Sequence, residues 1–414
     1  MSDDRLQEGI YFRSGQRPPP YYRLLLLDYL PHTQVEQAHA ALEQIFAMLG
    51  DLRTGTVRDL AGQDEEQIAK AVGELGETDS MFAFGARLFD HTLHDPPLLS
   101  APRPKYLVSL THDGDPLPAV AWSSERDRWG GEADVAIQLT GPSDAAVNRA
   151  AIEVWKLLAD EKLPLAIVSS FAGFSRRDGR GWLDFHDGVS NIESSERLLA
   201  IRATADPTWM AGGTYMAFLR YAVDLSAWRA LTRAQQELIV GRDKLTGQPV
   251  LGVRRGPAGE IVPVAEPAPP DEETSLAGAD FREPPEVSDP IVKASHLQRA
   301  NRNRASPWAL AGQRIYRQGY EFLHGLNGDG ISLGLNFVSF QADLGTLRRV
   351  LHLSGWLGDV NFGGPAAPSP GDPPNVQLLS LLAGGLYCVP PRDTPFPGAQ
   401  VFDHPPTPPS GPVR

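Results

Sequence analysis

The stretch Tyr21-Tyr22-Arg23-Leu24-Leu25-Leu26-Leu27-Asp28-Tyr29 has the aromatic and aliphatic density of a β-strand, and a helical pattern follows it. The apolar positions of that helix are Val35, Ala38, Leu42, Ile45, Phe46 and Leu49, and Gly50 is expected to end it. The plan recurs at residues 134–139, which predict a strand, before a helix that Ser143 can cap. That helix is expected to present Val147, Ala151, Val154, Trp155 and Leu158 on one face.

The second half of the chain repeats this order. Residues 214–220 and 335–341 predict strands, and helices are expected at about 226–239 and 344–353. Further strands are expected at 81–86 and 378–389. Two strand–helix units in each half predict an α+β fold, in which each half is a mostly antiparallel sheet covered by helices on one face. A doubly wound parallel sheet, which needs more closely spaced repeats, is the alternative.

The length of 414 residues indicates two domains, or one fold built from two halves. We expect an N-terminal domain at 1–160 and a C-terminal domain at 161–400. Residues 256–290 are rich in Pro, Glu and Asp and are expected to form an irregular insertion. Residues 401–414 predict a proline-rich extended tail.

Charge and cysteine content exclude several classes of protein. The net charge of −13 argues against nucleic acid as a partner, because such binding depends on basic residues. Cys388 is the single cysteine, so intramolecular disulfides, iron–sulfur clusters and CxxCH haem attachment are excluded. The first residues show no signal peptide, and the apolar runs are too short to span a bilayer. We therefore expect a cytoplasmic protein with no membrane partner.

Two polar segments carry residues with chemical potential. Asp187 lies in Phe185-His-Asp-Gly-Val-Ser-Asn191, where a carboxylate could move a proton. His296 opens a basic stretch and could ligate iron, and Arg317 follows with a permanent positive charge. Each has an ordinary alternative: Asp-Gly is a common turn, and the chain has ten histidines. The arginines after His296 could equally form a solvated face.

Together these segments resemble the dye-decolorizing peroxidase family over nearly the whole chain. The strongest match is Gly212-Gly-Thr-Tyr215 with Gln235-Gln-Glu-Leu-Ile-Val-Gly-Arg-Asp-Lys-Leu-Thr-Gly247. The family's Gly-x-x-Asp-Gly signature falls on residues 184–188, and its His-x-x-Arg-Ala-Asn pattern falls on residues 296–301. Arg317 takes the place of the family's distal arginine.

The resemblance implies two ferredoxin-like halves, with one non-covalent haem b bound mainly by the second. It implies that His296 is the iron ligand, and that Asp187 or Arg317, or both, promote cleavage of hydrogen peroxide. The other residues implied to contact the haem are Gly188, Val189, Ser190, Asn301, Arg302, Arg304 and Phe337. The implied reaction reduces peroxide to water through a ferryl intermediate and oxidises dye-like or phenolic organic donors. A homo-oligomer is compatible with this reading.

Several positions depart from the family pattern. Asp184 replaces the first glycine of the signature, and His186 adds a second titratable group beside Asp187. Arg302-Asn303 replaces the usual Pro-Arg, so either Arg302 or Arg304 is the expected propionate ligand. Asn336 is polar where the family is apolar.

These departures leave two other functions open beside the peroxidase. The first is a haem-binding or haem-handling protein with little turnover, and the second is an interaction module that has lost haem. Asp343 and Asp372 are candidate partners for the ring of His296.

Overall fold

The structure of the protein is a computed structural model. It describes residues 5–12, 16–53, 66, 78–90, 92–94, 97–99, 101–110, 130–186, 192, 194–204, 207–267, 285–300, 314–327, 330–351 and 378–402. Its main feature is a closed barrel with the strand order β1-β3-β2-β10-β5-β9-β8-β4, to which both halves of the chain contribute four strands. A separate two-stranded sheet consists of β6 and β7.

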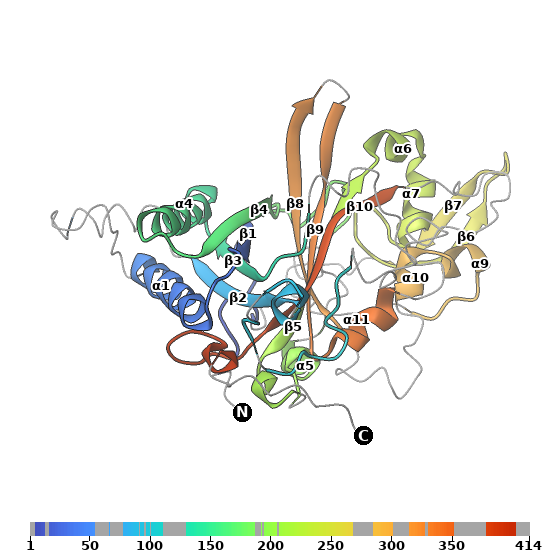
Figure 1. The fold of residues 1–414 in the computed structure, drawn as a ribbon. Helices are drawn as coiled ribbons and strands as arrows, with labels where there is room; N and C mark the ends of the chain where they lie inside the picture. Colours follow the sequence, from blue (N-terminus) through green and yellow to red (C-terminus); the bar gives the residue numbers. More distant parts are fainter. Residues whose placement is uncertain are drawn as a thin grey trace.

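The first four strands form an antiparallel sheet in the order β4-β1-β3-β2. They are β1 (Tyr21–Tyr29), β2 (Asp79–Gly85), β3 (Val135–Gly141) and β4 (Leu165–Phe174). Helix α1 (Val35–Arg53) follows β1, and α4 (Asp144–Asp160) connects β3 to β4. Both helices cover the outer face of these strands (Figure 1). This β-α-β-β-α-β order is that of a ferredoxin-like fold.

The second half repeats the arrangement in the order β10-β5-β9-β8. Its strands are β5 (Thr214–Val223), β8 (Tyr316–Asn327), β9 (Gly330–Gln341) and β10 (Leu379–Val389). Helix α11 (Leu344–Leu351) connects β9 to β10, while a long excursion separates β5 from β8. The excursion contains α6 (Leu225–Ala230), α7 (Arg233–Val240), β6 (Val250–Arg255), β7 (Ile261–Ala265), α9 (Pro290–Lys293) and α10 (His296–Ala300).

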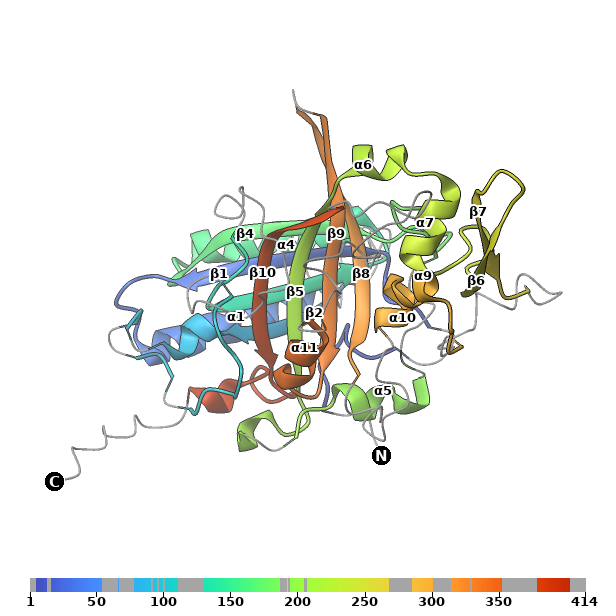
Figure 2. The same cartoon turned by 90° about the vertical axis from the view of Figure 1, so that its right-hand side faces the viewer.

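Shorter elements connect these parts. They are α5 (Ser194–Ile201) and the 3₁₀ turns η2 (Ala86–Phe89), η3 (Thr208–Met210) and η6 (Ala399–Val401). Helices α7, α9 and α10 lie together (Figure 2). The α+β class and its helix-covered antiparallel sheets are therefore confirmed. Strand β4 pairs with β1 and therefore belongs to the first sheet, although it follows residue 160, the expected end of the first domain. The division into domains itself stays a prediction.

Four local predictions are corrected. Helix α1 continues through Gly50 to Arg53, where an ion pair with Glu8 holds its last turn. Instead of one helix at 226–239, the chain forms α6 and α7, because Thr232 caps α7 in a reciprocal capping box with Gln235. Trp155 is 61 % exposed, whereas it was expected on the buried face.

The fourth correction concerns the expected irregular insertion. Residues 261–265 within it form β7, which pairs with β6 in an antiparallel hairpin. The Ser143 cap is confirmed, because its Oγ accepts a hydrogen bond from the Ala146 N–H at 3.1 Å. Among the described residues, none of the helices has both the length and the apolar character needed to cross a bilayer.

Candidate functional site

His296 is the first residue of the short helix α10, and its neighbours hold it in place. The Oγ of Ser295, which is fully buried, accepts a hydrogen bond from the Gln298 N–H at 3.4 Å. The side-chain amide of Gln298 donates to the carbonyl oxygen of Pro285 at 3.0 Å. Asp289 caps the preceding helix α9 through the N–H groups of Ile291 and Val292. His296 therefore projects from a segment fixed on both sides.

The C-terminal end of α7 packs directly against this segment. Gly241 has a left-handed φ of +88°, and a Cβ at this position would lie 2.9 Å from the Cβ of Leu297 and would collide with Ser295. Only glycine combines this backbone conformation with such a close approach. The next residue, Arg242, is buried and donates from Nη1 to the carbonyl oxygen of Gly247 at 2.7 Å. The α7 terminus thus brings a buried guanidinium beside the histidine.

Burial and the positive charges of Arg317 and Arg242 lower the pKa of His296 from its ordinary value to about 3. The imidazole is therefore neutral at physiological pH, so a ring nitrogen can offer a lone pair to a metal. Burial, with the charge of Arg317, also lowers the pKa of Arg242 to about 10, and the guanidinium remains charged at neutral pH. The site is electropositive around a neutral nitrogen base.

Arg317 and Phe337 share the outer face of the β8–β9 hairpin. Arg317 pairs in register with Ser339, and Gly319 pairs with Phe337. Side chains alternate along a strand, so this face is opposite to that of Tyr316 and Tyr320, which point into the barrel. Phe337 also makes an edge contact with Tyr221, with ring centroids 6.5 Å apart. The charge of Arg317 acts on His296, and Phe337 lies on the strand next to that of Arg317.

The turn that precedes Asp187 in sequence is fastened to the loop after α7. Arg180 donates from Nη1 to the carbonyl oxygens of Asp184 at 2.6 Å and Lys244 at 2.7 Å, and from Nη2 to that of Leu245 at 2.8 Å. Arg180 and His186 also form an isolated antiparallel β-bridge. Burial and the charge of Arg180 lower the pKa of His186, so this ring is neutral as well.

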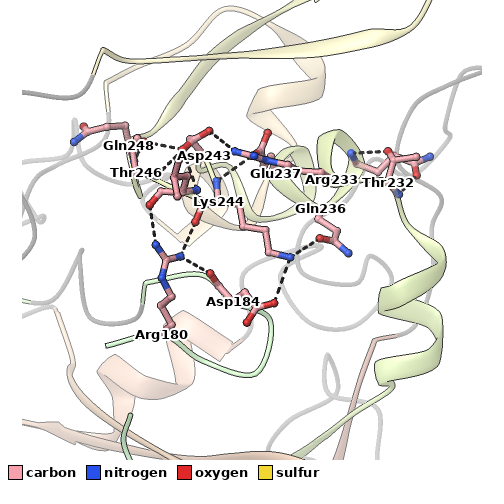
Figure 3. A network of polar contacts seen from close by, with 12 residues as sticks. Arg180, Asp184, Thr232, Arg233, Gln236, Glu237, Asp243, Lys244, Thr246 and Gln248 are labelled. Atoms are coloured by element: carbon pink, nitrogen blue, oxygen red, sulfur yellow. Dashed lines mark hydrogen bonds and ion pairs between the residues drawn. The ribbon is translucent and has the colours of Figure 1, made fainter. Parts of the chain in front are cut away.

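Figure 3 shows how this turn and α7 are connected by polar side chains. Lys244 donates to the Gln236 side chain at 2.8 Å, and its Nζ lies 3.7 Å from the carboxylate of Asp184. The backbone N–H of Lys244 donates to the buried carboxylate of Glu237 at 3.0 Å. The same loop therefore contacts the turn before Asp187 and carries Arg242, whose charge acts on His296.

Other expected site residues lie outside the described part of the chain. They are Asp187, Gly188, Val189, Ser190, Asn301, Arg302 and Arg304, together with the candidate partner Asp372. Asp343, the other candidate partner of His296, caps α11 by accepting from the N–H and hydroxyl of Thr346 at 2.9 and 2.6 Å.

Asn336 also has a structural role. Its side chain is fully buried, donates to the carbonyl oxygen of Ala172 at 2.9 Å, and accepts from the guanidinium of Arg220. Arg220 lies with its guanidinium 3.4 Å from the ring centroid of Phe322. The polar residue therefore satisfies a buried arginine inside the barrel.

Sequence reasoning missed Arg242 as a site residue. It lies in the stretch 235–247 that carries the strongest family resemblance, but nothing in the sequence relates it to a histidine 54 positions later. Its burial and its contact with Gly247 are the features that mark it, and both are tertiary.

The donor set is compatible with the haem that the sequence implies. A neutral imidazole is the form that ligates iron, and it is the form His296 adopts. Cationic side chains beside it suit an anionic porphyrin with two propionates, and Arg242 and Arg317 supply such charge. The chemistry of these residues therefore fits a haem group.

This chain is similar to known proteins in sequence and in fold. A dye-decolorizing peroxidase of Thermobifida fusca is 30 % identical over 246 residues, covering 56 % of this chain and 51 % of that protein. A deferrochelatase of Shigella flexneri is 28 % identical over 273 residues, covering 61 % and 56 %. The chain thus spans about half the length of these relatives.

Among solved structures, the DyP-type peroxidase from Cellulomonas bogoriensis superposes with a TM-score of 0.67 at 18 % identity, covering 96 % of each chain. That likeness concerns the fold. The sequence model of the C-terminal part of Dyp-type peroxidases matches residues 178–393, which is more than half of the chain. This segment contains His296, Arg317 and the α7 loop. The chain belongs to the Dyp-type peroxidase family.

Proposed function

We propose that this protein is a haem-dependent peroxidase that reduces hydrogen peroxide to water while oxidising dye-like, phenolic or other organic one-electron donors. The observation that carries the proposal is the neutral imidazole of His296 beside the cations Arg317 and Arg242. Membership of the Dyp-type peroxidase family supports the same chemistry. Cytoplasmic residence and the oligomeric state stay predictions.

His296 would hold the haem iron through a ring nitrogen, and one non-covalent haem b per chain is proposed. A bound haem would supply the redox-active iron at which peroxide is reduced and the donor oxidised. Phe337 is proposed to contact the haem, as are Gly188, Val189, Ser190 and Asn301. Arg302 or Arg304 is proposed to bind the propionates.

Two side chains are proposed to act on peroxide. Asp187 would move a proton from one peroxide oxygen to the other, because a carboxylate can accept and return it. Arg317 would stabilise the negative charge that develops on the leaving oxygen, because its guanidinium is a cationic hydrogen-bond donor. His186, whose ring is neutral, directly precedes Asp187 in the sequence. It is therefore the titratable neighbour of the residue proposed to transfer the proton.

The proposal is tested first by haem binding. The full chain with added haem should show a strong Soret band, and His296→Ala should lose it. The exposed His32, substituted by Asn to suit its φ of +64°, is the matched control and should keep the band. A wild-type protein without a Soret band would contradict the proposal.

The second test is the peroxide reaction in stopped flow. Arg317→Leu should retain haem but react with peroxide roughly 10²–10³-fold more slowly, the usual effect of losing one charge-stabilising group. Arg229→Leu removes an exposed arginine of α6 and should react at the wild-type rate. Full-speed reaction of Arg317→Leu would mean that the guanidinium does not stabilise charge.

The relatives named deferrochelatase favour a second candidate, a haem-handling protein with little peroxidase turnover. The same stopped-flow experiment separates the two functions. A haem-loaded protein whose spectrum stays unchanged after peroxide is added would support this second candidate.

A further inference from the structure

The barrel interior contains buried polar groups that no protein atom satisfies. Among the described residues, the hydroxyls of Tyr22, Thr140 and Tyr320, both side-chain amide atoms of Gln138, and Oε1 of Gln318 have no hydrogen-bond partner. Their residues are between 0 and 2 % exposed, so bulk solvent does not reach them either. Native proteins rarely leave such groups unsatisfied.

These groups gather in one region of the barrel. Tyr22 and Thr140 are direct register partners on β1 and β3. The ring of Tyr22 stacks on that of Tyr320, with centroids 4.5 Å apart and planes inclined by 16°. Gln318 lies two residues before Tyr320 on β8, so its side chain is on the same inner face.

The N-terminal segment closes this region from one end of the barrel. The side-chain amide of Gln318 donates to the carbonyl oxygens of Gly9 and Ile10 at 3.1 and 3.2 Å. A Cβ on Gly9 would lie 3.4 Å from Oγ1 of Thr140 and 3.7 Å from Nε2 of Gln138. The unsatisfied amide and hydroxyl groups therefore surround the same backbone turn.

We propose that this end of the barrel is a binding site for a cluster of internal water molecules. The groups on β1 and β3 come from the first half of the chain and those on β8 from the second, so the water would bridge the two halves. Each hydroxyl and amide can donate or accept, and an internal water needs two to four such partners. The site does not depend on haem.

A surface hollow lies next to this site. A hollow of about 540 Å³ opens at the N-terminal segment, and Gly9 and Asp79 are among the residues that line it. Asp79 is the register partner of Thr140 on the adjacent strand β2. Neither His296 nor Arg317 lines this hollow, so it is distinct from the proposed haem site.

Tyrosine-to-phenylalanine variants test the proposal by the sign of their effect. If water binds the hydroxyls, Tyr22→Phe and Tyr320→Phe should each lower the melting temperature, because a hydrogen bond is lost. In a dry interior the same variants would raise it, because an unsatisfied buried hydroxyl would be removed. Tyr29→Phe calibrates the loss of a direct bond, since its hydroxyl donates to the carbonyl oxygen of Ala38 at 3.1 Å.

Counting the water completes the experiment. Oxygen-17 relaxation dispersion on the full-length variants should show fewer long-lived internal waters in Tyr22→Phe and Tyr320→Phe than in the wild type. Tyr29→Phe should keep the wild-type number. An unchanged count in both interior variants, or a raised melting temperature in either, would overturn the proposal.

Discussion

At the scale of single residues, Asp184 shows how a departure from a family signature is accommodated. Its φ is +63°, in the left-handed region that the usual glycine adopts freely. Aspartate tolerates this region better than most residues with a side chain. The turn is closed by the Asp184 N–H, which donates to the Gly181 carbonyl oxygen at 2.8 Å, and by Arg180. The turn therefore keeps a glycine-like geometry with an acidic residue.

Two substitutions separate the backbone role of Asp184 from its charge. Asp184→Ala should lose about 1 kcal/mol in the free energy of unfolding, because alanine disfavours the left-handed region. Asp184→Gly should stay within about 0.5 kcal/mol of the wild type, since its ion pairs with Arg176 and Lys244 are exposed and therefore weak. Urea denaturation measures both. An equal loss of unfolding free energy in the two variants would show that the charge of Asp184, and not its backbone conformation, determines the stability of the turn.

At the scale of elements, the loop after α7 depends on Asp243. Its carboxylate accepts from the N–H of Leu245 at 3.0 Å and from the N–H and hydroxyl of Thr246 at 2.6 and 2.8 Å. Arg233 adds an ion pair at 3.1 Å from the first turn of α7. Burial alone would raise the pKa of Asp243, but these hydrogen bonds and the charge of Arg233 outweigh it and lower the pKa.

The lowered pKa fixes the sign of a pH effect. A carboxyl group with a depressed folded-state pKa stabilises the protein above its unfolded value of about 3.9, and this stabilisation is lost as pH falls through the folded-state pKa. Asp243→Asn should therefore be destabilised by roughly 1–3 kcal/mol at pH 7. Its difference from the wild type should shrink below about pH 4.

Urea denaturation at pH 7 and at pH 3 measures this difference. The exposed Asp393, which among the described residues accepts only from the next residue's N–H at 3.0 Å, is the matched control, and Asp393→Asn should show little change at either pH. A pH-independent difference for Asp243→Asn would contradict the assigned electrostatic role.

At the scale of the whole molecule, two short seams close the barrel. Within each half the strands pair over many residues. By contrast, β2 and β10 pair at two positions, and β4 and β8 pair only where Phe174 faces Glu321, as far as the described residues show. Gly173 lies at the second seam. A Cβ there would lie 2.6 Å from Nδ2 of Asn336 and 2.8 Å from the Cβ of Tyr320. The seam therefore needs a residue without a side chain.

A pair of glycine-to-alanine variants tests this requirement. Gly173→Ala should lower the free energy of unfolding by about 1–3 kcal/mol, because its methyl group has no room at the seam. Gly50→Ala should raise it by up to about 1 kcal/mol, since that position lies within α1 and has no atom within 4 Å of an added Cβ. Thermal or urea unfolding of both variants measures the contrast. A neutral Gly173→Ala would mean that the seam is more adaptable than its contacts indicate.

The sequence alone was enough to predict most elements and the fold class. Dense runs of aliphatic and aromatic residues predict strands such as β1 and β5, and apolar spacing with a serine cap predicts helices such as α4. These signals are local, so they can be recognised in the sequence without knowing which strands pair. The sequence also predicts His296 and Arg317 as site residues, because His296 opens a pattern of the family and Arg317 takes the place of the family's distal arginine.

Only the tertiary structure decided how the two halves meet and what surrounds His296. The barrel order joins β2 to β10 and β4 to β8, strands far apart in the chain, and no local pattern encodes such pairs. The charge of Arg242 acts on His296 because Gly241 turns the end of α7 against Ser295 and Leu297. Long-range packing sets the burial and the neighbouring charges, and these determine that the imidazole is neutral.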